Sequence, residues 1–422
     1  MSILEITTVL LLLASFFSII NLRLLKLPQT IGLMILAICL SLFVLAIGVI
    51  FPDFLDIVTG LTKDFDFSVL LIDVMLPFLL FAGAISVDVH ELLKDKVTIL
   101  FLATFGVAFS TFALGTGVFW LIEQPFFGLN DIGISYVDCL LFGALIAPTD
   151  PIAVLSIVKK MNLSSITVTR IAGESLFNDG IGVVIFLTLL KVKLMGVENV
   201  TPEGISMLFA TEVIGGILLG CALGYLGLKL VKYIENEHVE LEVLITLSLV
   251  LLVTVVANEF HLSGPLGVVM MGLFLNRNID TDKIEEGVQK AMGEYVYKFW
   301  HLLDETLNAI LFILIGLEII PIFQNFAPAY FLISIITIIL VVVSRGIGVS
   351  IPIMILSLYK KFEKRTSLII TWGGLRGGLS IALALNLPDT IGDGKNLILF
   401  LTYMVVLFTI IFQGLTLEKL HK

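Results

Sequence analysis

Long apolar segments recur along almost the whole chain, and short polar connections separate them. Because a helix of about 20 apolar residues crosses a hydrocarbon core of about 30 Å, each such segment predicts a membrane span. Thirteen spans result, near 3–25, 29–51, 67–86, 97–122, 136–157, 171–190, 208–231, 240–258, 263–276, 303–323, 330–358, 367–387 and 395–416. The pattern predicts an all-α integral membrane protein. We expect residues 1–422 to form a single transmembrane domain without a soluble domain, with the N-terminal segment retained as the first span.

The basic residues support this number of spans and orient the chain. Lys and Arg number 19 in the connections after odd-numbered spans, against 4 at the N-terminus and after even-numbered spans. Since cytoplasmic loops collect positive charge, we expect the N-terminus outside and the C-terminus in the cytoplasm. Omitting the short ninth span would destroy this asymmetry. One longer connection, 277–302, carries apolar residues three or four positions apart and predicts a surface helix that joins two bundles.

The composition excludes several classes of protein. The chain is 58% hydrophobic and 14% charged, with a mean hydropathy of +1.09, whereas soluble domains carry about 25% charged residues. The net charge of −10, without a basic patch, argues against nucleic-acid binding. Cys39, Cys139 and Cys221 show no spacing typical of disulfides or of a metal site. We expect no cofactor, no nucleic-acid partner and no enzymatic activity.

A charged residue interrupts the fifth span. Asp150 stands between Pro148 and Pro151 in an otherwise apolar stretch, and a charge at bilayer depth is costly unless it is paired or faces water. Each proline removes a backbone donor, which is tolerated at depth where the freed carbonyls line a cavity or meet a ligand. The sequence therefore predicts an unwound turn at an ion-binding residue. A proline kink, with the aspartate capping the following half-helix, is the structural alternative.

The sixth span carries two polar stripes. At a spacing of four residues, Ser175 lies over Asp179 and Glu174 lies over Asn178, on adjoining faces of the helix. Carboxylate, hydroxyl and amide oxygens suit a hard cation such as Na⁺ or Li⁺, and the set is too poor in His and Cys for a transition metal. Together with Asp150, these residues predict an ion site.

Two arginines lie inside later spans. The permanently charged Arg345 needs an acidic partner, and Glu174 is the candidate by elimination, because Asp150 and Asp179 are needed elsewhere. We favour a structural buried pair over direct ion handling. Arg376 lies among four glycines in the twelfth span, which predicts a second unwound stretch. We expect it to offset the positive half-helix ends or to balance the acids; close helix packing is the alternative explanation of the glycines.

The two interrupted spans are the fifth and the twelfth, seven spans apart. An odd offset means that the second enters the membrane in the opposite direction, so the chain is predicted to contain two inverted six-helix repeats joined by a linker helix at 208–231. Discontinuous helices at corresponding positions of inverted repeats mark the binding site of secondary transporters. We therefore expect helices five and twelve to cross in a core bundle and to form the transport site.

Four motifs make a resemblance recognisable. A-P-T-D-P at 147–151, G-E-S-L-F-N-D-G at 173–180, Ser344-Arg345 and G-G-L-R-G-G at 373–378 resemble the monovalent cation/proton antiporter family that includes NhaP and the eukaryotic sodium/proton exchangers. The resemblance implies exchange of Na⁺ or Li⁺ for H⁺ in a prokaryotic plasma membrane, with a role in sodium and pH homeostasis. It also implies a homodimer in the lipid bilayer.

The resemblance further implies an architecture and a ligand set. A core bundle (97–190 and 330–416) would move like an elevator against an interface bundle (1–90 and 240–325). The implied cation ligands are Asp179, Ser175, Asp150 and the Thr149 backbone, and the Glu174–Arg345 pair is implied as well. Asn178 resembles the neutral member of the family's Asn-Asp pair, the form associated with electroneutral one-for-one exchange.

The chain departs from the family in the third span. Many relatives carry an acid directly after the L-L-F sequence, where this chain has Ala82. Asp73 lies nine residues earlier, about two and a half helical turns away, and is a candidate accessory acid. Whether it replaces the missing acid stays open at the level of sequence.

The predicted mechanism is competition for one carboxylate. A buried Asp179 can hold a proton or a cation but not both, and an empty, charged site is too costly to cross the membrane. A K⁺/H⁺ antiporter of the same family is the alternative substrate choice. A cation channel would require a filter-like sequence, which the chain does not show. An intramembrane aspartyl protease would use Asp150 and Asp179 as a catalytic pair, but neither lies in the sequence context of such enzymes.

Overall fold

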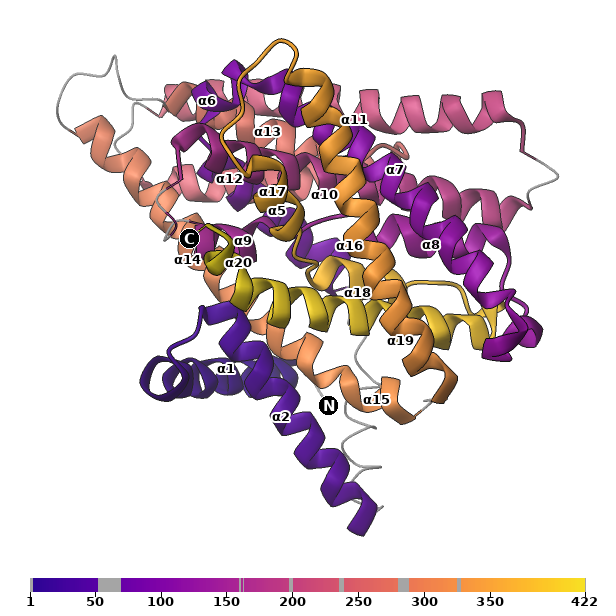
Figure 1. The fold of residues 1–422 in the computed structure, drawn as a ribbon. Coiled ribbons are helices and arrows are strands. Elements are labelled where there is room, and N and C mark those ends of the chain that lie inside the picture. The colour runs from indigo at the N-terminus through magenta and orange to yellow at the C-terminus, as the bar shows by residue number, and fades with distance from the viewer. Residues whose placement is uncertain are drawn as a thin grey trace.

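The computed structural model describes residues 3–51, 70–158, 161, 163–196, 200–234, 239–279, 288–324 and 328–421, and these are helical or connecting segments without a strand. The prediction of an all-α chain is thus confirmed for the described residues. Figure 1 shows α11 and α19 running across the view, while α14 runs obliquely from the left toward α15.

The first half of the chain forms the helices α1 (Ile3–Ile20), α2 (Gln29–Ile50), α5 (Leu76–Ser86), α6 (Val89–Lys94), α7 (Lys96–Ile122), α8 (Tyr136–Ile146), α9 (Pro151–Val158), α10 (Ser165–Met195) and α11 (Pro202–Tyr233). The second half forms α12 (Val239–Glu259), α13 (Gly264–Ile279), α14 (Val288–Leu317), α15 (Ile319–Gln324), α16 (Pro328–Leu356), α17 (Thr366–Trp372), α18 (Gly378–Leu385), α19 (Asp393–Leu407) and α20 (Gly414–His421). Short π-helical segments are η1 (Asn21–Leu25), η2 (Leu70–Met75) and η7 (Phe408–Gln413), and 3₁₀ turns are η3 (Pro125–Phe127), η4 (Asn130–Ile132) and η6 (Asp389–Ile391).

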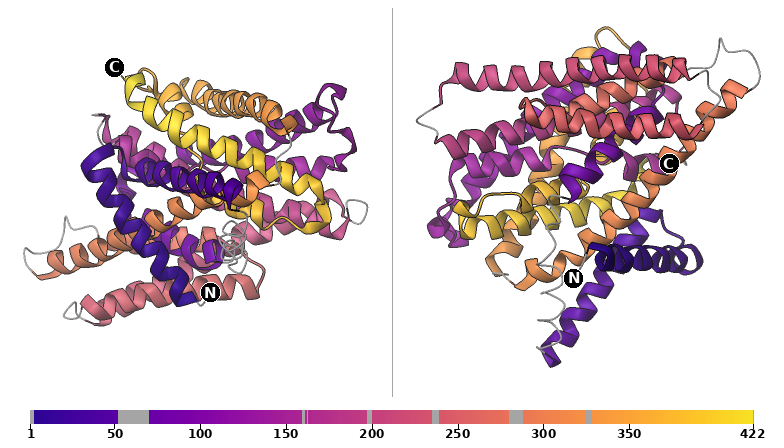
Figure 2. Two further views of the ribbon diagram at one scale, coloured as in Figure 1. Left: turned by 90° about the horizontal axis from the view of Figure 1, so that it is seen from below. Right: turned by 180° about the vertical axis from the view of Figure 1, so that it is seen from behind.

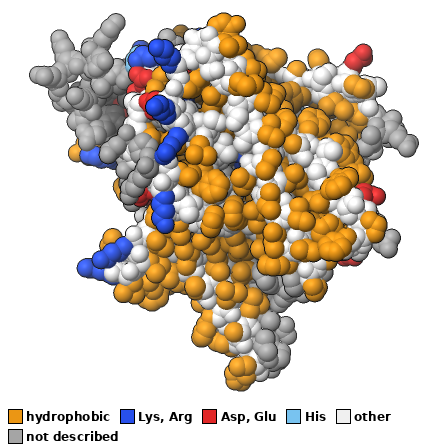
Figure 3. Space-filling view, viewed as in Figure 1, with side chains coloured by type: hydrophobic (Ala, Val, Ile, Leu, Met, Phe, Trp, Pro, Cys, Tyr) orange, Lys and Arg blue, Asp and Glu red, His pale blue; other side chains and the backbone are white. Residues whose placement is uncertain are grey.

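Many of these helices are long and apolar enough to cross a membrane. Among the described residues, nine helical segments have the length and the apolar composition needed to cross a membrane. Three shorter apolar segments cover Leu70–Ser86, Tyr136–Ile146 and Gly264–Asn276. In Figure 3, hydrophobic side chains cover the middle of the visible face, and Lys and Arg gather toward its left edge. This distribution is typical of a protein embedded in a bilayer.

The helices pack in two groups. In one group α7 packs against α8, α10 and α16, and α19 packs against α16 and α18. In the other, α14 packs against α1, α2 and α5, and α13 packs against α5 and α12. Helix α11 lies along α13 and α12 and also touches α10 (Figure 2). Contacts of α10 with α13, and of α18 with α14 and η2, join the two groups.

The predicted surface helix of the long connection is not a separate element. Helix α14 begins at Val288 and continues through the tenth predicted span to Leu317, because neither proline nor a cluster of glycines interrupts that stretch. The first residue of the predicted apolar face, Ile284, lies outside the described residues. A long, tilted helix therefore runs from the connection into the bundle.

A buried ionic cluster fixes one end of the first group. Asp95, which precedes α7, accepts hydrogen bonds from Thr98 (2.6 Å), from Lys360 (2.6 Å) and from Arg170 at the start of α10. Burial alone would raise the pKa of Asp95, but these donors hold that pKa below its ordinary value of 3.8. The cluster ties α7 to α10 and to the connection between α16 and α17.

We expect Asp95→Asn to lower the free energy of unfolding by roughly 1–3 kcal/mol, since the buried Arg170 would lose its carboxylate partner. A pKa that is lower in the folded state means that the stabilisation is complete above the ordinary value and is lost only as the pH falls through the folded-state pKa. The difference in thermal midpoint between the two proteins should therefore stay constant from about pH 5 to about pH 8. A difference that shrinks as the pH rises in this range would contradict the assignment.

Candidate functional site

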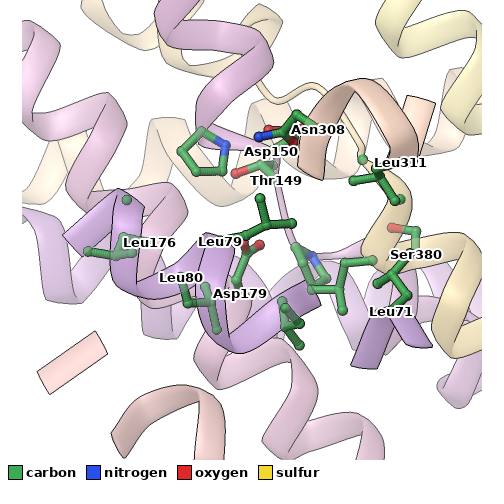
Figure 4. Close-up of a pocket in the computed structure, with 17 residues that line it drawn as sticks. Leu71, Leu79, Leu80, Thr149, Asp150, Leu176, Asp179, Asn308, Leu311 and Ser380 are labelled. Atoms are coloured by element: carbon green, nitrogen blue, oxygen red, sulfur yellow. The ribbon is translucent and has the colours of Figure 1, made fainter. Parts of the chain in front are cut away.

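A small cavity lies where the two helix groups meet. It offers about 50 Å³ to water-sized atoms, enough for a few water molecules or a partly hydrated monovalent cation. Its polar lining residues are Thr149 and Asp150 between α8 and α9, Asp179 on α10, Asn308 on α14 and Ser380 on α18 (Figure 4). The rest of the lining is leucine, proline and glycine. An apolar chamber therefore holds a few oxygen-bearing side chains from both groups.

The interruption of the fifth predicted span places Asp150 in this cavity. Helix α8 ends at Ile146 and α9 begins at Pro151, with no helix in between, because prolines at 148 and 151 cannot donate to the helical ladder. The Asp150 Oδ1 accepts a hydrogen bond of 3.1 Å from the Ala153 N–H, which caps α9. Asp150 thus caps α9, as the structural alternative expects, and it also lines the cavity.

A second interruption crosses the first. Helix α17 ends at Trp372 and α18 begins at Gly378, and the Asp150 N–H donates to the Leu375 carbonyl at 2.7 Å. A Cβ on Gly377 would lie 2.8 Å from Asp150 Oδ2, so only glycine lets the second segment pass this close. Each interruption thereby satisfies backbone groups that the other has freed.

Arg376 contacts the backbone of the first interruption. Its guanidinium donates to the carbonyls of Ala147 and, at 2.8 Å, of Pro148, and its N–H donates to Thr409 Oγ1 at 3.1 Å. The carbonyls belong to the C-terminal end of α8, which is the negative end of a helix. Of the two predicted roles, the offset of positive half-helix ends is therefore wrong, because the guanidinium neutralises freed carbonyl oxygens at a negative helix end. The other role, a balance of the acids, stays a prediction.

Asp179 projects from the uninterrupted helix α10. It is 8% exposed, accepts a hydrogen bond from the Thr149 backbone, and has Asp150 and Glu174 as acidic neighbours and Arg376 as its basic neighbour. Two carboxyl groups that share a small apolar cavity repel one another when both are charged. A proton or a bound cation relieves that repulsion, so the arrangement can exchange one for the other.

A network behind the cavity holds Thr149 in place. Its Oγ1 lies 2.9 Å from Ser175 Oγ and accepts a hydrogen bond of 3.2 Å from Asn178 Nδ2. The same amide donates to Glu174 Oε1 at 3.1 Å. The structure brings Arg345 and Glu174 together as a bidentate pair, at 2.7 and 2.8 Å, with both side chains buried.

The candidate residues thus fall into two sets. Thr149, Asp150 and Asp179 line the cavity, whereas Ser175 and Asn178 lie behind it, bonded to Thr149. The candidate accessory acid, Asp73, lies on η2. Its side chain is exposed and does not line the cavity. Ala82 is buried and does not line the cavity either.

Two cavity residues were missing from the sequence prediction. Asn308 and Ser380 each line the cavity. Ser380 is a single hydroxyl in an apolar stretch, which is common in membrane helices. Asn308 follows the polar residues 304–306 and so reads as the polar end of a span.

Known proteins that resemble this chain match it over almost its whole length. The family described as "Sodium/hydrogen exchanger, transmembrane" matches residues 11–422. The Na⁺/H⁺ antiporter NhaP of Pseudomonas aeruginosa is 38% identical over 99% of this chain and 96% of its own length. The Na⁺/H⁺ antiporter NhaH of Halobacillus dabanensis is 34% identical, over 98% and 96%. The sodium proton antiporter MjNhaP1 of Methanocaldococcus jannaschii has a similar fold, with a TM-score of 0.76 at 20% identity over 99% of this chain and 97% of that structure.

Proposed function

The chain belongs to the sodium/hydrogen exchanger family of membrane antiporters, and we propose that it exchanges Na⁺, and also Li⁺, for H⁺ at the cavity formed by the two interrupted helices. The observation that carries this proposal is the position of Asp150 and Asp179, two buried carboxyl groups facing one small apolar cavity. Carboxylate and hydroxyl oxygens are suitable ligands for a hard monovalent cation. Transport of this kind involves no covalent chemistry and no resident cofactor.

Exchange follows from competition at Asp179. The charged, empty carboxylate is costly in an apolar chamber, so the site crosses the membrane either protonated or with a cation bound. The Thr149 backbone N–H donates to Asp179, and Asp150 supplies the second carboxylate. Ser175 and Asn178 support the site from behind, through Thr149.

The experiment that tests this function uses purified protein in liposomes. An imposed Na⁺ gradient should drive proton movement that is recorded by a pH-sensitive dye, and the response should saturate with Na⁺ concentration. Repeating the assay with Li⁺ and K⁺ ranks the cations and separates a sodium antiporter from a potassium antiporter. Proton movement that is independent of a counter-ion, or conduction without saturation, would favour a channel and sink the proposal.

We expect one-for-one exchange, because the residue beside Asp179 is the neutral Asn178 and a single carboxyl group then alternates between the two ions. The steady-state exchange rate should be unchanged when a valinomycin-clamped potential of about 100 mV is imposed, although this potential would supply about 2.3 kcal/mol for each net charge moved. A rate that responds to the imposed potential would show net charge movement and contradict electroneutrality.

We further propose thirteen membrane crossings arranged as two inverted six-helix repeats around a linker helix at 208–231. In the described residues, nine long helical segments and three shorter apolar ones account for twelve crossings. The interrupted pair α17 and α18 supplies the thirteenth, because each of these helices is too short to cross the membrane alone. The two interruptions fall in the fifth and the twelfth predicted spans, which are corresponding positions of the two repeats, as is typical of such transporters.

Movement and assembly complete the proposal. The group containing α7, α8, α10, α16, α18 and α19 would slide, carrying the carboxylates, along a fixed group containing α1, α2, α5, α12, α13 and α14. We propose that the fixed group of two copies forms a homodimer in the plasma membrane. The concentration of Lys and Arg at one edge (Figure 3) supports a cytoplasmic C-terminus, with the N-terminus outside. Sodium and pH homeostasis is the cellular role that fits this activity.

A further inference from the structure

One polar side chain of the cavity comes from the group of helices that does not carry the carboxylates. Asn308 lies on α14, is 4% exposed and lines the same cavity as Asp150 and Asp179. Figure 4 labels it next to Asp150 and Thr149. The other lining residues from this group are leucines of η2, α5 and α14 together with Gly83. Asn308 is therefore the one oxygen-bearing side chain that this wall of the cavity contributes among the described residues.

The orientation of the Asn308 amide follows from its hydrogen bonds. Its Nδ2 donates to the Asp304 carbonyl at 2.8 Å and to Asp304 Oδ1 at 3.1 Å. A carbonyl and a carboxylate can only accept, so the NH₂ group must point at them and the amide oxygen must point away. The described residues provide no hydrogen bond to this oxygen, and the oxygen is not fully buried. It is therefore accessible from the cavity that Asn308 lines. The oxygen is thus oriented toward the space of the cavity.

Among the described residues, this wall of the cavity contributes no carboxyl group. Ala82 on α5 is buried outside the cavity, and Asp73 on η2 is exposed and does not line it. In the described part of the chain, this wall contributes no charged side chain to the cavity, and the amide oxygen of Asn308 is the polar side-chain atom that it offers to a cation. A carbonyl-type oxygen is a suitable ligand for a hard cation, and it adds no negative charge that would bind a proton instead.

We infer that Asn308 is a cation ligand of the fixed helix group, oriented by Asp304, and that it sets the affinity and selectivity for the transported cation. The inference rests on the proposed antiport function. It adds a contact between the cation and the fixed helix group, which does not move with the carboxylates. Because α14 stays behind when the carboxylates move, Asn308 completes the site in one access state and is absent from it in the other. Apparent cation affinity should therefore depend on Asn308 from one side of the membrane only.

The test compares three variants in proteoliposomes with sided access. Asn308→Leu, which has a similar size and no oxygen, should raise the KM for Na⁺ about tenfold from one side, the change expected for loss of one neutral polar contact. The KM from the other side should change less than about twofold. Asn308→Gln keeps the amide, and the cavity can hold the added methylene, so its KM should return to within about threefold of the original protein.

Asn276→Leu is the matched control. Asn276 lies on α13 of the same helix group and donates to the Ala84 and Val87 carbonyls, away from the cavity. Its loss should reduce thermal stability but leave the KM for Na⁺ unchanged. An unchanged KM in Asn308→Leu, an equal rise from both sides, or an equal rise in Asn276→Leu would each overturn the inference.

A binding measurement separates this inference from the proposed function. Na⁺-dependent thermal stabilisation reports cation binding without transport, and its half-saturation should shift about tenfold in Asn308→Leu. If the original protein is stabilised by Na⁺ but exchanges no protons, the proposed function fails while the shift still decides the role of Asn308. If exchange is normal and the half-saturation does not shift, the inference fails and the antiport function stands.

Discussion

Replacing Asp179 with asparagine is expected to abolish Na⁺-driven proton movement. The amide has nearly the shape of the carboxyl group, but it can neither release a proton nor balance the charge of a cation. Since Asp179 is buried in the cavity beside Asp150, no water-exposed group takes its place. We expect the rate in proteoliposomes to fall at least about 100-fold, as removal of a group that carries the exchanged proton requires.

The variant should still fold. Asparagine removes a charge from an apolar chamber, which relieves the desolvation cost rather than adding to it. Asp389→Asn is the matched control, because Asp389 is an exposed aspartate paired with Lys395 outside the cavity, and it should retain exchange. Substantial Na⁺-driven proton flux in Asp179→Asn, with the protein shown to be monodisperse, would remove Asp179 from the mechanism.

The second large effect is expected at the Glu174–Arg345 pair. Arg345→Met should lower the free energy of unfolding by about 3–5 kcal/mol, because it leaves the buried Glu174 carboxylate without its bidentate partner. Glu174→Gln should be similarly costly, since it strands the guanidinium. The double variant Glu174→Gln with Arg345→Met should recover most of the loss, because neither charge is then left unpaired.

The measurement is the thermal midpoint of the detergent-solubilised protein, with Asp389→Asn again as the surface control. Full recovery of stability in the double variant with little exchange would show that the pair also orients the site, because Glu174 holds Asn178, which in turn holds Thr149. A single variant as stable as the original protein would mean that the pair contributes nothing to the fold.

The sequence predicted the helical class, the positions of both interruptions and the two carboxylates, because charges and prolines inside apolar spans are rare and have few physical explanations. Asp150 and Asp179 stand out for this reason. The pairing of Arg345 with Glu174 could be reached by elimination, since few buried acids were available.

The remaining features depend on tertiary structure. Helical spacing places Ser175 and Asp179 on one face, but it does not show that the Thr149 hydroxyl lies between Ser175 and the cavity. Asn308 reaches the cavity because α14 runs obliquely as one long helix, and no local pattern reveals that tilt. The carbonyl partners of Arg376 arise only when the two interrupted segments cross.

The crossing of the two interruptions has an evolutionary consequence. The Asp150 N–H and the Leu375 carbonyl satisfy one another, and the Arg376 side chain satisfies the end of α8. A mutation that rewound either segment into a continuous helix would strand buried polar groups in the other. Neither half of the chain can therefore repair its interruption alone, and we expect the two segments to change together in evolution while the surrounding apolar residues vary more freely.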